Sequence, residues 1–444
     1  MKKQSKIFPS LLFSCILFTP SFAFSDIEKK AQAPQHNFPL AEQLSSSSIE
    51  NKREQYLNDR GWSLGYNTKS NGSQFYIGWG EADIKESPES IAYIDSRVLA
   101  FESALLTAKG EFARLSGSRI ATKTVQKFFQ DELSQPAELQ PGSTFSQISQ
   151  KLGALGNASL DKLLMELEVD PETFTLTQKQ KLAQDSLRKT STVKAISRVS
   201  GIRPLVTFED NNTMGVLIVY SEKLREQASA IAQGKLLHKP DVIPGRPSIK
   251  AQLAKMLPND SDYIFQHGIR ILQDERGNPV LVSFAQSGVR VTKSSGKMKT
   301  SMALKAARSA AKSLSAAHIA EFINATVNLQ DKTTLAESAI IEQVTEDGIS
   351  SEEESLNTGK IINNFIKQGA KARLTGVTTL KAWVKNHPNT GHLIAGEVKA
   401  WSPYLSNASQ SFRSPPKSQS SPKSKNKTEN QLRHSADFES DASF

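Results

Sequence analysis

The chain has 444 residues, 38% of them hydrophobic, with a formal net charge of +10 and a single cysteine. This length is sufficient for two or three domains of roughly 100–200 residues. One cysteine excludes a fold held by several internal disulfide bonds, and the spread of charge in local runs of both signs is typical of a solvated surface. We expect no nucleic-acid partner, while attraction to an anionic polymer or a membrane surface stays open.

Residues 1–25 have the pattern of a secretory signal peptide. Three lysines form a positive start, and an apolar run interrupted by two prolines follows over residues 7–24. Ala23-Phe24-Ser25 then matches the small residues of a cleavage site, with cleavage after Ser25 or after Ala23. The run falls short of the roughly 20 clean apolar residues of a membrane span. The sequence predicts an exported chain, periplasmic or secreted, with a mature net charge of +7 and no transmembrane segment.

Cys15 lies inside this apolar run, after Leu12-Phe13-Ser14, which faintly resembles a lipoprotein processing box. Phenylalanine is unsuited to that box, and the apolar run continues past the cysteine. We therefore expect ordinary cleavage in place of lipidation at Cys15. The mature chain then has no cysteine for a disulfide bond, a thiolate metal site or a nucleophile.

The mature chain is predicted to begin with a flexible polar lead over residues 26–48. A short helix follows over 49–59, and two strands follow over 62–66 and 73–84, around a turn at 67–72 that is rich in Asn, Ser and Gly.

A long amphipathic helix is predicted over residues 88–115. Its apolar residues recur at threes and fours along one face: Ile91, Ile94, Val98, Phe101, Leu105, Ala108, Phe112 and Leu115. Ser87 is suited to the cap, Pro88 to the first turn, and Gly117 to the position after the end. A strand that leads into such a helix is a packing unit and gives no sign of an active site.

The next part of the chain is predicted to be a helical insert over residues 120–188 and a second hairpin. The elements are helical character over 120–133, a loop over 134–143, helices over 145–155, 160–169 and 170–187, strands over 190–208 and 213–220, and a helix over 222–233. Four prolines and glycines fall within 239–247, so that we place a linker over 235–247.

The same order of elements then returns. A helix over 248–257, strands over 263–272 and 279–291, a long alanine-rich helix over 300–326, helices over 335–344 and 356–367, and strands over 372–385 and 391–401 are predicted. The fold class expected is α+β, with two related modules over 49–234 and 248–405. Each is expected to have a mainly antiparallel sheet packed against a long helix.

Charged and low-complexity segments complete the chain. Lys305, Arg308 and Lys312 form a basic face on the second long helix, which is predicted to be solvated, with a site for an acidic partner as the alternative. Residues 406–444 are rich in Ser, Pro and Lys and are predicted to be a disordered tail, because they cannot bury enough apolar area.

No motif in the sequence predicts a catalytic or cofactor-binding residue. Three Gly-Lys pairs lack the other residues of a phosphate loop, and Gly78-x-Gly80 lacks the third glycine of a dinucleotide fingerprint. The nucleophile motif Gly-x-Ser-x-Gly is absent from the sequence, and no Ser-x-x-Lys occurs with its companion motifs. A Ser/His/Asp triad is assembled by the fold and leaves no local signature in sequence order, so that the sequence does not exclude one.

Metal ligands are also not predicted. His387 and His392 flank one turn and, with Glu397, could hold zinc, but nothing in the sequence marks the third ligand. Glu352-Glu353-Glu354 fits the start of a helix better than a calcium loop.

The tryptophans on predicted strands leave two readings open. We expect Trp79, Trp383 and Trp401 to pack in the core, with an exposed wall-binding or sugar-binding face as the alternative.

Two segments carry a family resemblance. The run from Ala382 to Gly391, Ala-Trp-Val-Lys-Asn-His-Pro-Asn-Thr-Gly, and the run from Gly396 to Pro403 resemble the closing hairpin of a group of uncharacterised exported bacterial proteins, the domain of unknown function 6844 family. The strand-plus-helix units are more distantly similar to secreted lipoprotein-type modules and to the N-terminal domain of flagellar assembly protein T. The closer resemblance covers residues 260–405 and implies an exported, envelope-associated protein without known catalytic residues.

The function expected is that of an exported, non-enzymatic envelope protein that acts through contacts with another, unknown envelope protein and needs no cofactor. One alternative is a periplasmic hydrolase, which requires a concave pocket with convergent polar groups and shifted pKa values. The other is an electrostatic binder of an anionic polymer or membrane surface through the basic helix and the tail, with binding that weakens as salt rises.

Overall fold

The computed structural model describes residues 49–132, 145–171, 174–234, 242–292, 294–329, 352–368 and 375–406. The predicted signal peptide, the lead over 26–48, the loop over 134–143, the helix over 335–344 and the tail from residue 407 lie outside these ranges. Within them, no helix combines the length and the apolar character needed to cross a membrane.

The first sheet has four antiparallel strands: β1 (Gly65–Thr68), β2 (Gln74–Asp83), β3 (Arg203–Glu209) and β4 (Thr213–Tyr220). Their order in the sheet is β1-β2-β4-β3, so that the second hairpin pairs through β4 with the long strand of the first. Gly80 of β2 lies against the long helix that follows, and a side chain at this position would overlap the carbonyl oxygen of Ala104. The glycine thus lets the helix approach the sheet closely.

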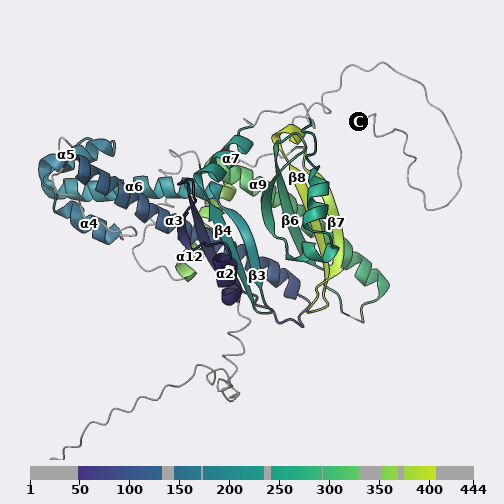
Figure 1. The fold of residues 1–444 in the computed structure, drawn as a ribbon. Helices are drawn as coiled ribbons and strands as arrows, with labels where there is room; N and C mark the ends of the chain where they lie inside the picture. Colours follow the sequence, from purple (N-terminus) through teal and green to yellow (C-terminus); the bar gives the residue numbers. More distant parts are fainter. Residues whose placement is uncertain are drawn as a thin grey trace, which may run out of the picture. The chain divides into compact units, whose positions relative to one another are not determined.

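The second sheet has the same strand order. It contains β5 (Gly268–Gln273), β6 (Pro279–Gly288), β7 (Thr378–Asn386) and β8 (Leu393–Trp401), arranged β5-β6-β8-β7 with all pairs antiparallel (Figure 1). The predicted α+β class, with two related modules and a mainly antiparallel sheet in each, is therefore confirmed.

Each sheet is covered by a long helix, α3 (Tyr93–Glu132) in the first module and α9 (Lys297–Asn328) in the second. The predicted bounds of α3 were wrong at both ends. The backbone from Ser87 to Tyr93 forms turns, with the Ser90 amide donating to the Ser87 carbonyl, so that Pro88 precedes the helix. The helix also runs through Gly117, where a Cβ atom would lie 3.8 Å from the Ala195 side chain of a neighbouring helix, an ordinary contact distance.

The remaining described helices are α2 (Ile49–Asn58), α4 (Phe145–Gly153), α5 (Asn157–Glu166), α6 (Leu176–Arg198), α7 (Glu222–Ala232), α8 (Ile249–Met256) and α12 (Glu352–Gln368), with short 3₁₀ turns η1 (Val199–Gly201) and η2 (Asp260–Phe265).

The strand predicted from residue 190 was wrong over its first part, because α6 continues to Arg198. Val193 and Ile196 bury one helical face against the core, and this tertiary packing overrides the strand preference of β-branched residues. Residues 263–265 likewise belong to η2 and not to a strand.

One hydrophobic core joins the two sheets. Its buried residues include Tyr76 and Phe101 of the first module together with Phe284 and Trp383 of the second. Helix α12 follows α9 in sequence but packs mainly on α3, with backbone against backbone. At that crossing, a side chain at Gly110 would overlap the Ser355 carbonyl oxygen, and one at Gly359 would overlap the Leu106 carbonyl oxygen.

A second, entirely helical core lies away from the strands. It contains residues of α3 from Ala121 onward, of α4 and α5, and of α6 up to Leu187. We call this group of four helical segments the helical arm; in Figure 1, α4 and α5 lie at the end of α3 and α6 that is far from the sheets. Because α3 and α6 contribute to both cores, the arm continues directly from the first module.

Candidate functional site

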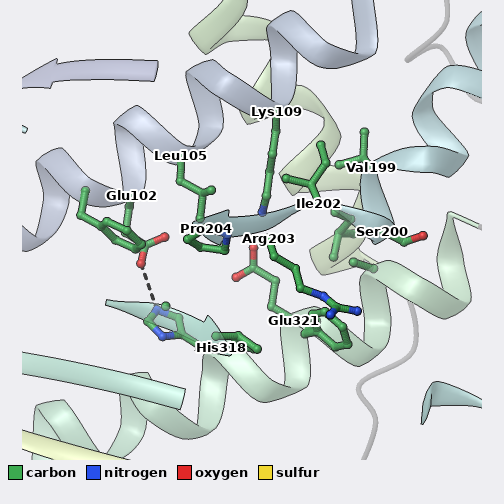
Figure 2. A pocket seen from close by; sticks show the side chains of 16 residues that line it. Glu102, Leu105, Lys109, Val199, Ser200, Ile202, Arg203, Pro204, His318 and Glu321 are labelled. Carbon is green, nitrogen blue, oxygen red and sulfur yellow. Dashed lines mark hydrogen bonds and ion pairs between the residues drawn. The ribbon is translucent and has the colours of Figure 1, made fainter. Parts of the chain in front are cut away.

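A small cavity lies where the two modules meet. Its volume is about 70 Å³, and it is lined by residues of α3, η1, β3, β5, α9 and α12 (Figure 2). The charged or ionisable side chains around it are Glu102, Lys109, Arg203, His318 and Glu321. Burial lowers the pKa of Arg203 to about 10, and its Nη2 donates to the Leu224 carbonyl at 2.9 Å.

One histidine of this cavity connects a carboxylate to a serine. His318 Nε2 lies 2.9 Å from Glu102 Oε1, and His318 Nδ1 lies 3.5 Å from Ser283 Oγ. Burial alone would lower the pKa of His318, but the hydrogen bond and charge of Glu102 outweigh burial and raise it. Sequence order could not reveal this Ser/His/Glu arrangement, because its members come from α3, β6 and α9.

The arrangement does not have the access that a hydrolase needs. Ser283 is fully buried under α9, where the Ser315 hydroxyl donates to the Ser283 carbonyl at 3.2 Å, and it does not line the cavity. A volume of about 70 Å³ is well below the roughly 300–1,000 Å³ that small-molecule sites occupy. An oxygen–nitrogen distance of 3.5 Å is also beyond that of a good hydrogen bond. These contacts link α3 to α9 and β6, and they leave no room for a substrate beside Ser283.

A second polar cluster is buried between the modules and centres on Arg97 of α3. Its Nε donates to Glu209 Oε2 at 2.8 Å, and its Nη2 donates to the Ile264 carbonyl at 2.9 Å. His387, in the turn after β7, places Nε2 3.7 Å from Glu209 Oε1. Burial would raise the pKa of Glu209, but the charge of Arg97 and the contacts of Arg97 and His387 lower it overall. The cluster fastens α3 and β3 of the first module to η2 and the β7–β8 turn of the second.

The three residues considered for zinc are not brought together. His387 faces Glu209, while His392 places Nε2 2.7 Å from the Pro88 carbonyl oxygen. Glu397 accepts a hydrogen bond of 2.7 Å from the Thr379 hydroxyl. Among the described residues, no three His, Cys, Asp or Glu side chains are grouped as metal ligands.

The tryptophans and charged residues considered from the sequence lie in the core, at its edge or on the surface. Trp383 and Trp401 are buried, as expected of core residues, and Trp79 is half-buried against Phe208 and the Arg53 guanidinium. Lys305, Arg308 and Lys312 are exposed on α9, and Glu352 begins α12.

Comparison with known proteins gives one family match and one similar solved structure. No curated protein matches the chain. The crystal structure of the hypothetical protein FTT1539c from Francisella tularensis is 21% identical, covers 84% of this chain and 93% of its own, and superimposes with a TM-score of 0.48. The sequence motifs that suggested a family lie within residues 260–405. The family model matches a different segment, which runs from α4 to α7. Residues 145–233 match the family described as Domain of unknown function (DUF6844), so that the resemblance expected from the sequence is confirmed for this part of the chain.

Proposed function

We propose that this chain is an exported, non-enzymatic protein that acts through protein–protein contacts in the bacterial envelope. The export part of the proposal rests on the leader pattern of residues 1–25. The contact part rests on the helical arm, which presents large apolar side chains to solvent.

Three apolar residues of the arm carry this proposal. Met165 near the end of α5 is 60% exposed, Phe174 just before α6 is 37% exposed, and Leu176 at the start of α6 is 41% exposed. All three lie at the connection between α5 and α6. Single exposed apolar residues are common on protein surfaces, but several on one connection favour a contact surface.

The two helices that flank this connection are fastened to each other and to the core of the arm. Thr175 caps α6 in a reciprocal arrangement with Gln178, and the Lys179 ammonium lies 2.6 Å from Asp161 of α5. Beneath them, Leu160, Leu163 and Leu164 are completely buried. A contact surface that is already ordered loses less conformational entropy on binding than a flexible one does.

Site-specific photo-crosslinking in living cells tests the contact part. A benzoylphenylalanine residue at Met165 should yield a discrete crosslinked product, and one at Leu176 should yield a product with the same partner. Met256 on α8 is the matched control, since it is a methionine of 62% exposure outside the arm, and it should yield no such product. Equal products from positions 165 and 256, or none from positions 165 and 176, would overturn the assignment to the arm.

Export is tested separately by cell fractionation and intact-mass measurement. We expect the chain in the envelope fraction, with a mass that corresponds to removal of residues 1–23 or 1–25. A chain that retains its leader and stays with cytoplasmic markers would contradict the export part.

A further inference from the structure

A larger hollow opens on the first module, where α3 and α6 pass from the sheet into the helical arm. Its volume is about 530 Å³, which is within the range of roughly 300–1,000 Å³ that small-molecule sites occupy. Residues of β1, β2 and β4 line one side, and residues of α3, α6 and the start of α7 line the other. It is separate from the cavity of Figure 2, with which it shares no lining residue.

The lining of this hollow is strongly cationic. Five basic side chains face one carboxylate: Arg119, Lys123, Lys194, Arg198 and Arg225 against Glu222, for a net charge of +4. The Glu222 carboxylate already has three partners. It accepts hydrogen bonds from the Tyr220 hydroxyl at 2.6 Å and from Arg225 Nε at 2.7 Å, and it lies 3.2 Å from Arg198 Nε. Among the described residues, Lys123 and Lys194 form no ion pair that would offset their charge.

The cations are close enough to repel one another. Burial lowers the pKa of Lys123, and the positive charges of Arg119 and Arg198 lower it further. Like charges without a counter-charge destabilise a fold, so that a cluster of this kind is typical of a site whose counter-charge belongs to a ligand. Glu111 acts on Tyr76 from α3 but does not line the hollow.

The polar groups of the wall are held in position before any ligand arrives. The Arg119 guanidinium stacks on the Tyr66 ring at 3.6 Å from its centroid and donates through Nη2 to Gln74 Oε1 at 3.3 Å. Tyr76 and Tyr220 are buried at the base, and burial is the main cause that raises the pKa of both phenols. Both therefore remain neutral near pH 7 and add no negative charge to the site.

We propose that this hollow binds a small organic phosphate with at least two negative charges, held by Lys123 and Lys194 together with the fixed guanidinium of Arg119. Guanidinium groups match the oxygen geometry of phosphate, and lysines add mobile positive charge. A net charge of +4 exceeds what a single carboxylate would offset and suits a dianion or a diphosphate.

Calorimetric titration of the purified full chain with inorganic pyrophosphate tests the proposal. The double variant Lys123→Ala/Lys194→Ala should bind pyrophosphate about ten- to hundredfold more weakly, as expected from the loss of charged hydrogen bonds. Both lysines are exposed, so that the variant should keep the circular dichroism spectrum of the parent chain. The matched control is Lys305→Ala/Lys312→Ala, which removes the same charge from the exposed face of α9 and should leave binding unchanged.

A second titration distinguishes a soluble phosphate from a lipid headgroup. Phosphatidylcholine vesicles with and without phosphatidic acid serve as probes, with sulfate as a divalent anion of different chemistry. Binding of pyrophosphate alone assigns a soluble ligand, and binding of the phosphatidic acid vesicles that is lost in the Lys123/Lys194 variant assigns a lipid headgroup. No binding of either probe, equal binding of sulfate and pyrophosphate, or a loss in the α9 control variant as large as in the test variant would overturn the proposal.

Discussion

Arg97 of α3 is a fully buried arginine that forms an ion pair with Glu209 of β3. It also donates to the Ile264 carbonyl of the second module. A buried ion pair is weak evidence for stability as a whole, because both charges lose their hydration. Removal of only one partner, however, leaves an uncompensated charge inside the protein.

We therefore expect Glu209→Gln to lower the free energy of unfolding by about 3–5 kcal/mol, measured by urea denaturation. Asp260→Asn is the control, since it removes the exposed contact with Lys381 and should cost about 0–1 kcal/mol. The double variant Arg97→Met/Glu209→Met removes both charges and should be less destabilised than Glu209→Gln. A double variant that is the least stable of the three would contradict the role of the unpaired charge.

His267 gives a prediction about pH. It is buried, and its ring stacks on that of Phe101 with 4.8 Å between the ring centroids. The side-chain amide nitrogen of Gln286 lies 3.1 Å from His267 Nε2, within hydrogen-bond distance. Burial is the main cause that lowers its pKa well below the ordinary value, and the positive charges of Arg97 and Arg270 add to the effect, with a smaller contribution from His318. The folded protein thus keeps this imidazole neutral while the unfolded chain protonates it below about pH 6.5.

Because the unfolded state then binds the extra proton, His267 should destabilise the fold as pH falls below about 6.5. The loss of stability should approach about 1.4 kcal/mol for each pH unit well below pH 6.5, where the unfolded chain is fully protonated at this position. Urea denaturation at pH 6.5 and pH 5.5 measures this effect, with His267→Gln as the comparison. The parent chain should lose about 1 kcal/mol more than the variant over this interval, because the unfolded chain is only half protonated at pH 6.5, and equal losses would show that His267 is not kept neutral.

At the scale of elements, we expect alanine substitutions at two glycines of α3 to change the stability of the protein in different ways. Gly110 lies at the crossing with α12, where a side chain would overlap the Ser355 carbonyl oxygen, while a Cβ atom added at Gly117 would have its nearest neighbour at 3.8 Å, an ordinary contact distance. Gly110→Ala should therefore destabilise the protein by about 1–3 kcal/mol or more through overpacking. Gly117→Ala should be neutral or stabilise it by up to about 1 kcal/mol, because alanine has the higher helix propensity. Thermal unfolding of both variants tests the pair, and a similar change in both would exclude backbone contact with α12 as the reason for Gly110.

Local sequence signals predicted some elements correctly and failed where packing between distant segments decides the structure. Hairpin turns were found because Asn, Asp and Gly mark them locally, as in the turn from Asp210 to Thr213. Gly117 was interpreted as a helix end from its local preference alone, but α3 continues to Glu132, and residues of α3 from Ala121 onward pack in the core of the helical arm with helices that are distant in sequence. The strand predicted from residue 190 failed for the same reason, since only the packing of Ile196 against the core shows that the segment is helical.

The candidate sites were less predictable than the elements. Arg97, Glu209 and His387 are separated by more than a hundred residues each, and none belongs to a local motif. The cationic hollow likewise takes Arg119 and Lys123 from α3, Lys194 and Arg198 from α6, and Arg225 from α7. The sequence placed positive charge on these segments, but only the fold determines that they face one another.

At the scale of the whole molecule, the two modules should unfold as one cooperative unit. The largest core contains Met214 and Val216 of β4 together with Val282 of β6 and Val398 of β8. Helix α12 of the second module packs on α3 of the first, so that neither sheet keeps its packing if the other opens. The helical arm has a separate core of its own and can open while the sheets stay intact.

Hydrogen exchange of the unmodified chain at increasing urea concentrations tests this description. Amides of β2, β4, β6 and β8 should share one opening free energy, equal to the global free energy of unfolding, because they depend on one core. Amides of α4 and α5 should exchange through a separate opening of lower free energy, since only the arm must be disrupted to expose them. Strands β6 and β8 that open at a lower free energy than β2 and β4 would show that the modules are independent. In that case the identical order of strands in the two sheets would reflect two domains that merely touch, and the glycine contact between α3 and α12 would not couple them.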